Sequence, residues 1–88
     1  MQAEKQEVET LLKTARGQID GILKMVEENR YCVDICNQLM ATTSILKKTN
    51  LMIMEAHVCG CVLEAIKNEQ SDEKLEEIVS LIRKIAKM

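Results

Sequence analysis

The sequence predicts an all-α fold, in which three helices per chain assemble into an antiparallel four-helix-bundle dimer and then into a dimer of dimers. The chain has no proline, three glycines and one aromatic residue, and 30% of its 88 residues are charged. This composition is typical of a nearly all-helical chain. Apolar residues also recur at spacings of three and four along most of its length. We expect residues 1–88 to form one domain, and a chain this short commonly needs oligomerisation to complete its core.

The first helix is expected over residues 2–28. Its apolar residues form one stripe at helical spacing: Val8, Leu12, Ala15, Ile19, Ile22 and Val26. Gly17 and Gly21 lie in the region of this stripe, and we expect them to allow a neighbouring helix to approach closely. Asn29 can end the helix in a left-handed conformation.

The second helix is expected over residues 31–68, a stretch with no proline and one glycine that carries all four cysteines and the only histidine. With Cys32 at its head, it has a heptad-like seam: Ile35, Leu39, Thr42, Leu46, Thr49, Ile53 and Ala56. So long a helix requires partner helices to cover it. An antiparallel dimer would cover the seam, with the first helix of each chain packed alongside.

The third helix is expected after a break in the pattern at residues 68–72. Ser71 or Asp72 is a suitable N-cap. The apolar residues that follow predict a short amphipathic helix: Leu75, Ile78, Val79, Ile82, Ile85 and Ala86.

Two pairs of metal-binding side chains lie near opposite ends of the second helix. Cys32 and Cys36 are one helical turn apart, as are His57 and Cys61, and residues four apart share a helix face. Because Cys32 and Cys61 are 29 residues apart, a continuous helix separates them by about 43 Å. When two copies of this helix pack antiparallel about a two-fold axis, residue i of one copy lies opposite residue j of the other, and the sum of i and j is the same for every such pair. The sum is 93 both for Cys32 with Cys61 and for Cys36 with His57, which predicts two equivalent sites shared between two chains.

The donor atoms of these pairs indicate the metal. Two thiolates and one imidazole, from Cys32, His57 and Cys61, suit Cu(I), whereas Cys36 as a fourth ligand would favour Zn(II). A single cysteine is often a small buried hydrophobe, but two pairs mirrored about one axis favour metal or thiol chemistry. Cys59 is about 200° around the helix from His57 and Cys61, so we expect it in the core or in solvent.

Composition and charge restrict the other functions. A net charge of −2 and the absence of Trp and Phe argue against a generic nucleic-acid binder and against base-stacking folds. The sequence has no apolar run long enough to span a membrane and no visible signal peptide, so we expect a cytoplasmic protein whose cysteines are thiols or metal ligands. We do not expect an enzyme, because His57 is the only acid or base near the thiols.

From about residue 11 to 82 the sequence resembles the CsoR/RcnR family of bacterial metal- and thiol-sensing transcriptional repressors. The resemblance rests on residues 17–22, residues 25–32 with the following Asp34 and Ile35, Gln38, and the Cys-x24-His-x3-Cys spacing. That spacing is the pattern of the copper(I)-sensing branch. The nickel and cobalt branch uses further histidines, and the persulfide-sensing branch typically lacks the histidine.

The resemblance implies a Cu(I)-responsive repressor, built as a homodimer that assembles to a homotetramer. Such a protein binds operator DNA in the apo state and releases it when metal binds. Tyr31 and Glu77 match family positions proposed to hydrogen-bond the free nitrogen of the liganding histidine, which would link the third helix to the metal. No membrane or small organic substrate is implied.

The resemblance also implies a DNA-binding surface on the first two helices. Its candidates are four basic residues: Lys13, Arg16, Lys47 and Lys48. Two residues depart from the family pattern, since Asp20 replaces a residue that is often basic and Arg16 stands where glutamate is frequent.

Three other interpretations stay open from the sequence alone. Cys32 and Cys61 could form an interchain di- or trisulfide in a persulfide sensor. Cys36 could complete a Zn(II) site. The chain could also be a helical interaction module whose cysteines are incidental.

Overall fold

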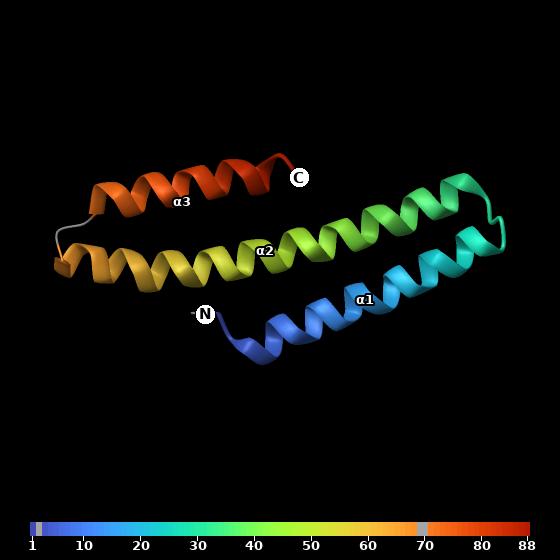
Figure 1. Cartoon of the computed structure of the whole chain (residues 1–88), viewed down its shortest axis with the longest axis horizontal. Helices are drawn as coiled ribbons and strands as arrows, with labels where there is room; N and C mark the ends of the chain where they lie inside the picture. Colours follow the sequence, from blue (N-terminus) through green and yellow to red (C-terminus); the bar gives the residue numbers. More distant parts are fainter. Residues whose placement is uncertain (2, 69–70) are drawn as a thin grey trace.

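In the computed structural model the chain folds into three α-helices, α1 (Lys5–Glu27), α2 (Cys32–Asn68) and α3 (Ser71–Ala86). The structure describes residues 1, 3–68 and 71–88, and among these every side chain except those at positions 61–63, 65, 66, 68 and 71. Helix α2 runs the length of the molecule. Helix α1 packs antiparallel along one half of α2 and α3 along the other half, on opposite edges (Figure 1). No strand occurs in the described ranges, so the predicted three-helix chain with an unbroken second helix is confirmed.

The turn between α1 and α2 depends on Asn29, which has a φ of 51°. Its N–H donates to the carbonyl of Val26 at 3.1 Å, and the N–H of Arg30 donates to the carbonyl of Met25 at 3.0 Å. This pair of hydrogen bonds satisfies the last carbonyls of a helix whose following residue is left-handed. The predicted left-handed end at Asn29 is therefore confirmed.

The apolar stripe of α1 divides into two rows with a spacing of seven residues. Val8, Ala15 and Ile22 are buried, whereas Leu12, Ile19 and Val26 are exposed. One α-helix can turn only one narrow row toward a single neighbouring helix, so the second row is left without a partner within the chain.

On α2 the row that faces α1 contains two threonines, Thr42 and Thr49, each with 4% of its surface exposed. The hydroxyl of Thr42 donates to Gln18 Oε1 across the two helices at 2.7 Å. The prediction that the whole heptad-like seam faces a second chain is wrong at these two positions. The reason is that hydroxyl groups can be buried where a partner accepts their hydrogen bond. Gln18 on α1 accepts from Thr42, and the carbonyl of Ile45, one turn earlier on α2, accepts from Thr49 at 2.8 Å.

Gly17 and Gly21 do not mark a close approach of helices within the chain. No atom of a neighbouring element lies within 4 Å of the position that a Cβ would occupy at either glycine. Both glycines are exposed. The prediction of a close approach there is wrong for this chain's own helices.

Helix α3 packs on α2 through a small apolar cluster. Met54 of α2 and Ile78 and Ile85 of α3 are buried, with Val58 and Leu81 packed against them. This cluster and the α1–α2 rows are separate, because α1 and α3 cover different halves of α2 (Figure 1).

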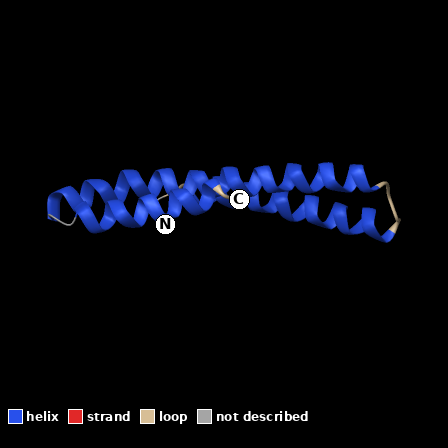
Figure 2. Cartoon of the chain, turned by 90° about the horizontal axis from the view of Figure 1, so that it is seen from above, coloured by secondary structure: helices blue, strands red, loops and turns tan. Residues whose placement is uncertain are grey.

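The molecule is a flat layer of helices that measures 57 × 26 × 12 Å (Figures 1 and 2). Its radius of gyration is 17.2 Å, compared with about 12 Å for a compact domain of this length. The flat shape leaves large apolar side chains exposed on every helix. In the described part of the chain, no helix is long and apolar enough to cross a membrane.

Candidate metal and DNA sites

The first half-site lies at the start of α2. Cys32 is the first residue of this helix, and Cys36 follows one turn later. Both are exposed free thiols. The backbone carbonyl of Tyr31 accepts hydrogen bonds from the N–H groups of Asp34 and Ile35 at 3.0 and 3.2 Å, which fixes the first turn of the helix around the two cysteines.

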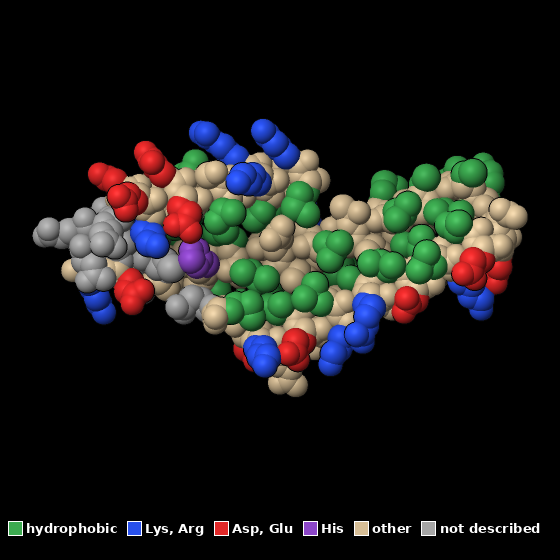
Figure 3. Space-filling view, in the orientation of Figure 1, with side chains coloured by type: hydrophobic (Ala, Val, Ile, Leu, Met, Phe, Trp, Pro, Cys, Tyr) green, Lys and Arg blue, Asp and Glu red, His purple; other side chains and the backbone are tan. Residues whose placement is uncertain are grey.

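The second half-site lies near the other end of α2, where His57 is half-buried. His57 lines a pocket of about 270 Å³ between α2 and α3, together with Met1, Ile53, Met54, Glu77 and Leu81. Glu77 thus lines the same pocket as His57 from the facing helix, and its carboxylate pairs with Lys74 at 3.8 Å. Figure 3 shows the single histidine (purple) at the surface, with acidic side chains nearby.

The other predicted donor of this half-site is Cys61. Its backbone continues α2, but its side chain lies outside the described residues. Among the described residues, His57 and Glu77 thus line one pocket, and the hydrogen bond between them that the resemblance implies stays a prediction.

The two half-sites do not meet within one chain. Helix α2 is continuous from Cys32 to Asn68, so the 25 residues between Cys32 and His57 correspond to about 37 Å along its axis. Tyr31, which is 69% exposed, lies beside Cys32 and equally far from His57. No three Cys, His, Asp or Glu side chains come together as a metal site among those described.

Cys59 lies away from His57. Its exposed side chain lines a separate pocket of about 520 Å³ with Leu51, Met54, Glu55, Val58 and Ile82. Of the two positions expected for Cys59, the core and the solvent, the structure has the exposed one.

The apolar surface between the two half-sites is exposed. Leu39 and Leu46 are exposed large side chains, and they follow Cys32 on α2 at intervals of seven residues, which places all three on one face. The exposed row of α1 runs beside them because α1 and α2 are antiparallel neighbours. Figure 3 shows hydrophobic side chains (green) along much of the half of the molecule where α1 packs on α2, on the right of the view.

The predicted DNA-contacting cations lie on the surface of the α1–α2 pair. Lys13, Arg16 and Lys48 are exposed and Lys47 is half-buried. The hydrogen bond between Gln18 and Thr42 shows how the two antiparallel helices are aligned. A residue of α1 lies opposite the residue of α2 whose number brings the sum of the two to about 60. Lys13 is therefore level with Lys47, and all four cations lie within about two turns along the layer.

The surroundings of these cations are of mixed charge. Lys48 lines one groove with Glu4 and Glu7. Lys47 and Lys48 line another groove with Glu55. The surface is therefore less basic than its four cations alone would indicate.

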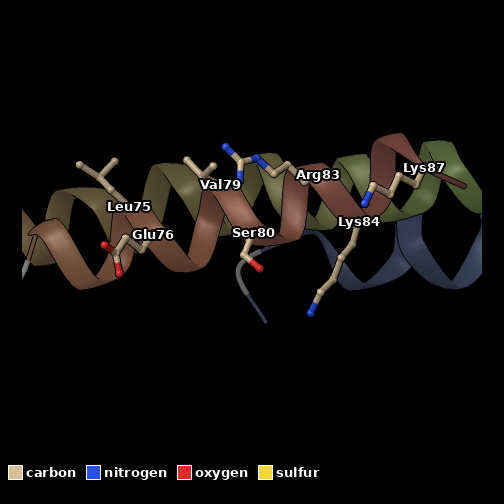
Figure 4. Close-up of a pocket in the computed structure, with 7 residues that line it drawn as sticks. All are labelled: Leu75, Glu76, Val79, Ser80, Arg83, Lys84 and Lys87. Carbon is tan, nitrogen blue, oxygen red and sulfur yellow. The ribbon is translucent and has the colours of Figure 1, made fainter.

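One basic surface was missed in the sequence. Arg83, Lys84 and Lys87 line one end of an open groove that runs along most of α3 and is also lined by Leu75, Glu76, Val79 and Ser80 (Figure 4). The signal that could have found it is a cluster of three cations within five residues of a chain whose net charge is −2.

Comparisons with known proteins agree on one family. Residues 4–84 match the family described as "Metal-sensitive transcriptional repressor". The copper-sensing transcriptional repressor CsoR of Bacillus subtilis (strain 168) is 37% identical over 84 residues, which cover 96% of this chain and 83% of the relative. CsoR of Mycobacterium ulcerans (strain Agy99) is 35% identical over 72 residues, which cover 82% of this chain and 62% of that longer relative.

Two solved structures share the fold. The crystal structure of the copper-sensing repressor CsoR with Cu(I) from Geobacillus thermodenitrificans NG80-2 has a TM-score of 0.82 and 35% identity, over 98% of this chain and 93% of that chain. The nickel-responsive transcriptional regulator InrS has the same TM-score with 25% identity, over 97% and 96% of the two chains. The fold thus occurs in regulators named for two different metals, so the donor residues must decide which metal fits.

Proposed function

The chain belongs to the metal-sensitive transcriptional repressors, a family of regulators rather than enzymes, and from this we propose that it is a Cu(I)-responsive repressor. In this proposal the apo protein binds operator DNA and releases it when Cu(I) binds. The observation that carries the proposal is the unbroken helix α2. This helix holds Cys32 so far from His57 that one chain cannot bring them together, and a second chain is needed to complete a site.

The donor set fits Cu(I). We propose Cys32 of one chain, with His57 and Cys61 of the other, as the ligands. Two thiolates and one imidazole are soft donors in the low number that Cu(I) accepts. When bound, Cu(I) would join the two half-sites, one from each chain. The exposed thiol of Cys32 and the surface position of His57 support access from a second chain.

Cys36 is the candidate fourth ligand. Its thiol is exposed, it lies on the same face as Cys32, and in the proposed dimer it is level with His57. With Cys36 engaged, four donors would favour tetrahedral Zn(II), which a direct competition between the two metals tests.

The exposed rows of α1 and α2 support the proposed dimer. They give each chain a two-helix apolar face, and two such faces packed antiparallel form a four-helix bundle. A two-fold axis near Leu46 brings Cys32 of each chain level with Cys61 of its partner. Helix α3 also has an exposed apolar residue, Ile82, and we propose that it contributes to pairing of dimers.

The pocket around His57 supports a link from the metal to α3. We propose that Glu77, which lines this pocket, and Tyr31 of the other chain hydrogen-bond the imidazole once its other nitrogen is occupied. Such partners fix the orientation of a liganding histidine. In this proposal the contact of Glu77 with the liganding imidazole ties α3 to the metal site, so that metal binding shifts α3 to a displaced arrangement. The metal lowers DNA affinity only if it binds the displaced arrangement more tightly.

We propose that Lys13, Arg16, Lys47 and Lys48 contact phosphates of the operator. Phosphate contacts orient a protein on DNA without reading sequence, and they make binding salt-dependent. The register of the α1–α2 pair supports this role because it gathers the four cations within two turns.

The test is a titration of the reduced protein with Cu(I), in the presence of a labelled duplex taken from upstream of its own gene. We expect one Cu(I) per protomer, and release of the duplex at that stoichiometry. Cys32→Ala should bind the duplex normally but retain it when Cu(I) is added. Equal affinity of the apo and Cu(I)-loaded protein for the duplex would contradict the proposed switch.

A further inference from the structure

The groove at the end of α3 is the most basic of the described grooves that contain lysine or arginine. Its volume is about 530 Å³, and its charged side chains are Arg83, Lys84, Lys87 and the single carboxylate of Glu76. Figure 4 shows Arg83 and Lys84 extending from opposite sides of the helix, with Lys87 further along the chain. No ion pair in the described part of the chain involves these three cations. Their charge is therefore available to a partner.

The end of this groove that carries the cations points toward the middle of the molecule (Figure 1). The amide of Asn50, on α2, donates to Met88 Sδ at 3.2 Å, so the end of α3 lies beside the centre of α2. Lys47 precedes Asn50 by three residues, less than one helical turn. Figure 3 shows basic side chains (blue) on both long edges of this central region.

We propose that Arg83, Lys84 and Lys87 form a second DNA-contacting surface that binds backbone phosphates of the operator. This inference rests on the proposed function as a DNA-binding repressor. The planar guanidinium of Arg83 suits a phosphate oxygen pair, and the two lysines supply point charges. The surface extends the contact region from the first two helices to all three.

The position of the groove also connects it to metal sensing. Glu77, in the pocket of His57, and Arg83 are on the same helix, six residues or about 9 Å apart. A helix of this length moves as one body. Any displacement of α3 at the His57 pocket therefore moves the three cations, which gives the metal a direct way to weaken phosphate contacts.

The first experiment measures DNA affinity against salt concentration for the full-length apo protein. The probe is a mixed-sequence duplex of about 30 base pairs, because each phosphate contact contributes about 0.9 to the slope of log affinity against log salt on any B-DNA. We expect the triple variant Arg83→Gln, Lys84→Gln, Lys87→Gln to lose about 2.7 units of slope for each protomer that contacts the duplex, and at least about tenfold in affinity at low salt. Its Cu(I) stoichiometry should stay unchanged. An unchanged slope would overturn the inference.

Single variants control for folding and for general loss of charge. Lys84→Gln should lower the slope by about one, whereas Lys67→Gln, an exposed cation near the end of α2, should leave it unchanged. Circular dichroism and sedimentation identify any variant that misfolds. If both single variants lower the slope equally, the effect is one of net charge and the inference is wrong.

A measurement on the unmodified protein is independent of all variants. Lysine acetylation read by mass spectrometry should show that DNA protects Lys84 and Lys87 but leaves Lys67 reactive. Reactivity of Lys84 and Lys87 that does not change with DNA would overturn the inference. If the unmodified protein binds no duplex at any salt concentration, the proposed function itself fails, which is a separate outcome.

Discussion

Mixing two variants that cannot bind Cu(I) should regenerate Cu(I) sites, if each site takes ligands from two chains. The perturbations are Cys32→Ala in one chain and Cys61→Ala in the other. Each variant alone lacks one thiolate in every site. A heterodimer of the two has one site with all three ligands, because Cys32 of the second chain meets the intact His57 and Cys61 of the first.

The expected yield follows from the geometry of the dimer. Helix α2 is continuous, and the 29 residues between the two cysteines hold them about 43 Å apart, so no chain can complete a site alone. Random pairing gives about one half heterodimers, and each heterodimer has one complete site out of two in a two-fold assembly. The mixture should therefore bind about one quarter of the Cu(I) that the unmodified protein binds.

The assay is retention of Cu(I) against a chelator that removes the metal from either variant but not from the unmodified protein. The two variants are unfolded together and refolded so that chains exchange. A mixture of His57→Ala with Cys61→Ala is the control, because both changes affect the same half-site and no complete site can form. Retention no higher in the test mixture than in this control would refute the shared site.

Three further predictions concern assembly, signalling and folding. Leu39 is 48% exposed in the single chain. Its side chain has three more carbons than that of alanine, and burying them fully stabilises by roughly 2.4 kcal/mol. About half of this free energy should be gained only on dimerisation. Leu39→Ala, with two copies per dimer, should thus weaken the dimer by about 2 kcal/mol, or roughly 30-fold. Leu75→Ala, also 48% exposed, should leave the monomer–dimer equilibrium in sedimentation unchanged, and equal effects would argue against the α1–α2 face. Glu77→Gln should keep Cu(I) affinity but lose release of the duplex, while Glu73→Gln, in the first turn of α3, behaves as the unmodified protein; release retained in Glu77→Gln would exclude the proposed link. Asn29→Ala should lower the free energy of unfolding in urea by about 1 kcal/mol because alanine disfavours a positive φ, and Asn29→Gly should not lower it; a stable Asn29→Ala would show that this turn tolerates another conformation.

The helices themselves could be predicted from the sequence because the signals for them are local. Spacings of three and four residues, the absence of proline, and Asn29 before the second helix are read within a few turns of chain. The predicted division of the metal site followed from the same local information, since the length of one unbroken helix sets the distance between its ends.

That Glu77 and His57 line one pocket could not be derived from local pattern. The two residues are on different helices, and only the packing of Ile78 and Ile85 against Met54 brings the helices together. The basic groove on α3 was missed for a related reason. Its three cations become a surface at the centre of the molecule only when the end of α3 is fixed beside Asn50.

The sequence by itself determined that this protein has three helices, and that the cysteines and the histidine proposed as metal ligands lie at opposite ends of the longest one. It could not determine which apolar row each helix buries, because on α1 both rows are apolar and both repeat every seven residues. The tertiary structure buries the row with Ala15 against α2 and leaves the row with Leu12 and Ile19 exposed. The physical reason is that one neighbour covers one row, and the row left uncovered is the surface on which we propose that a second chain completes the site.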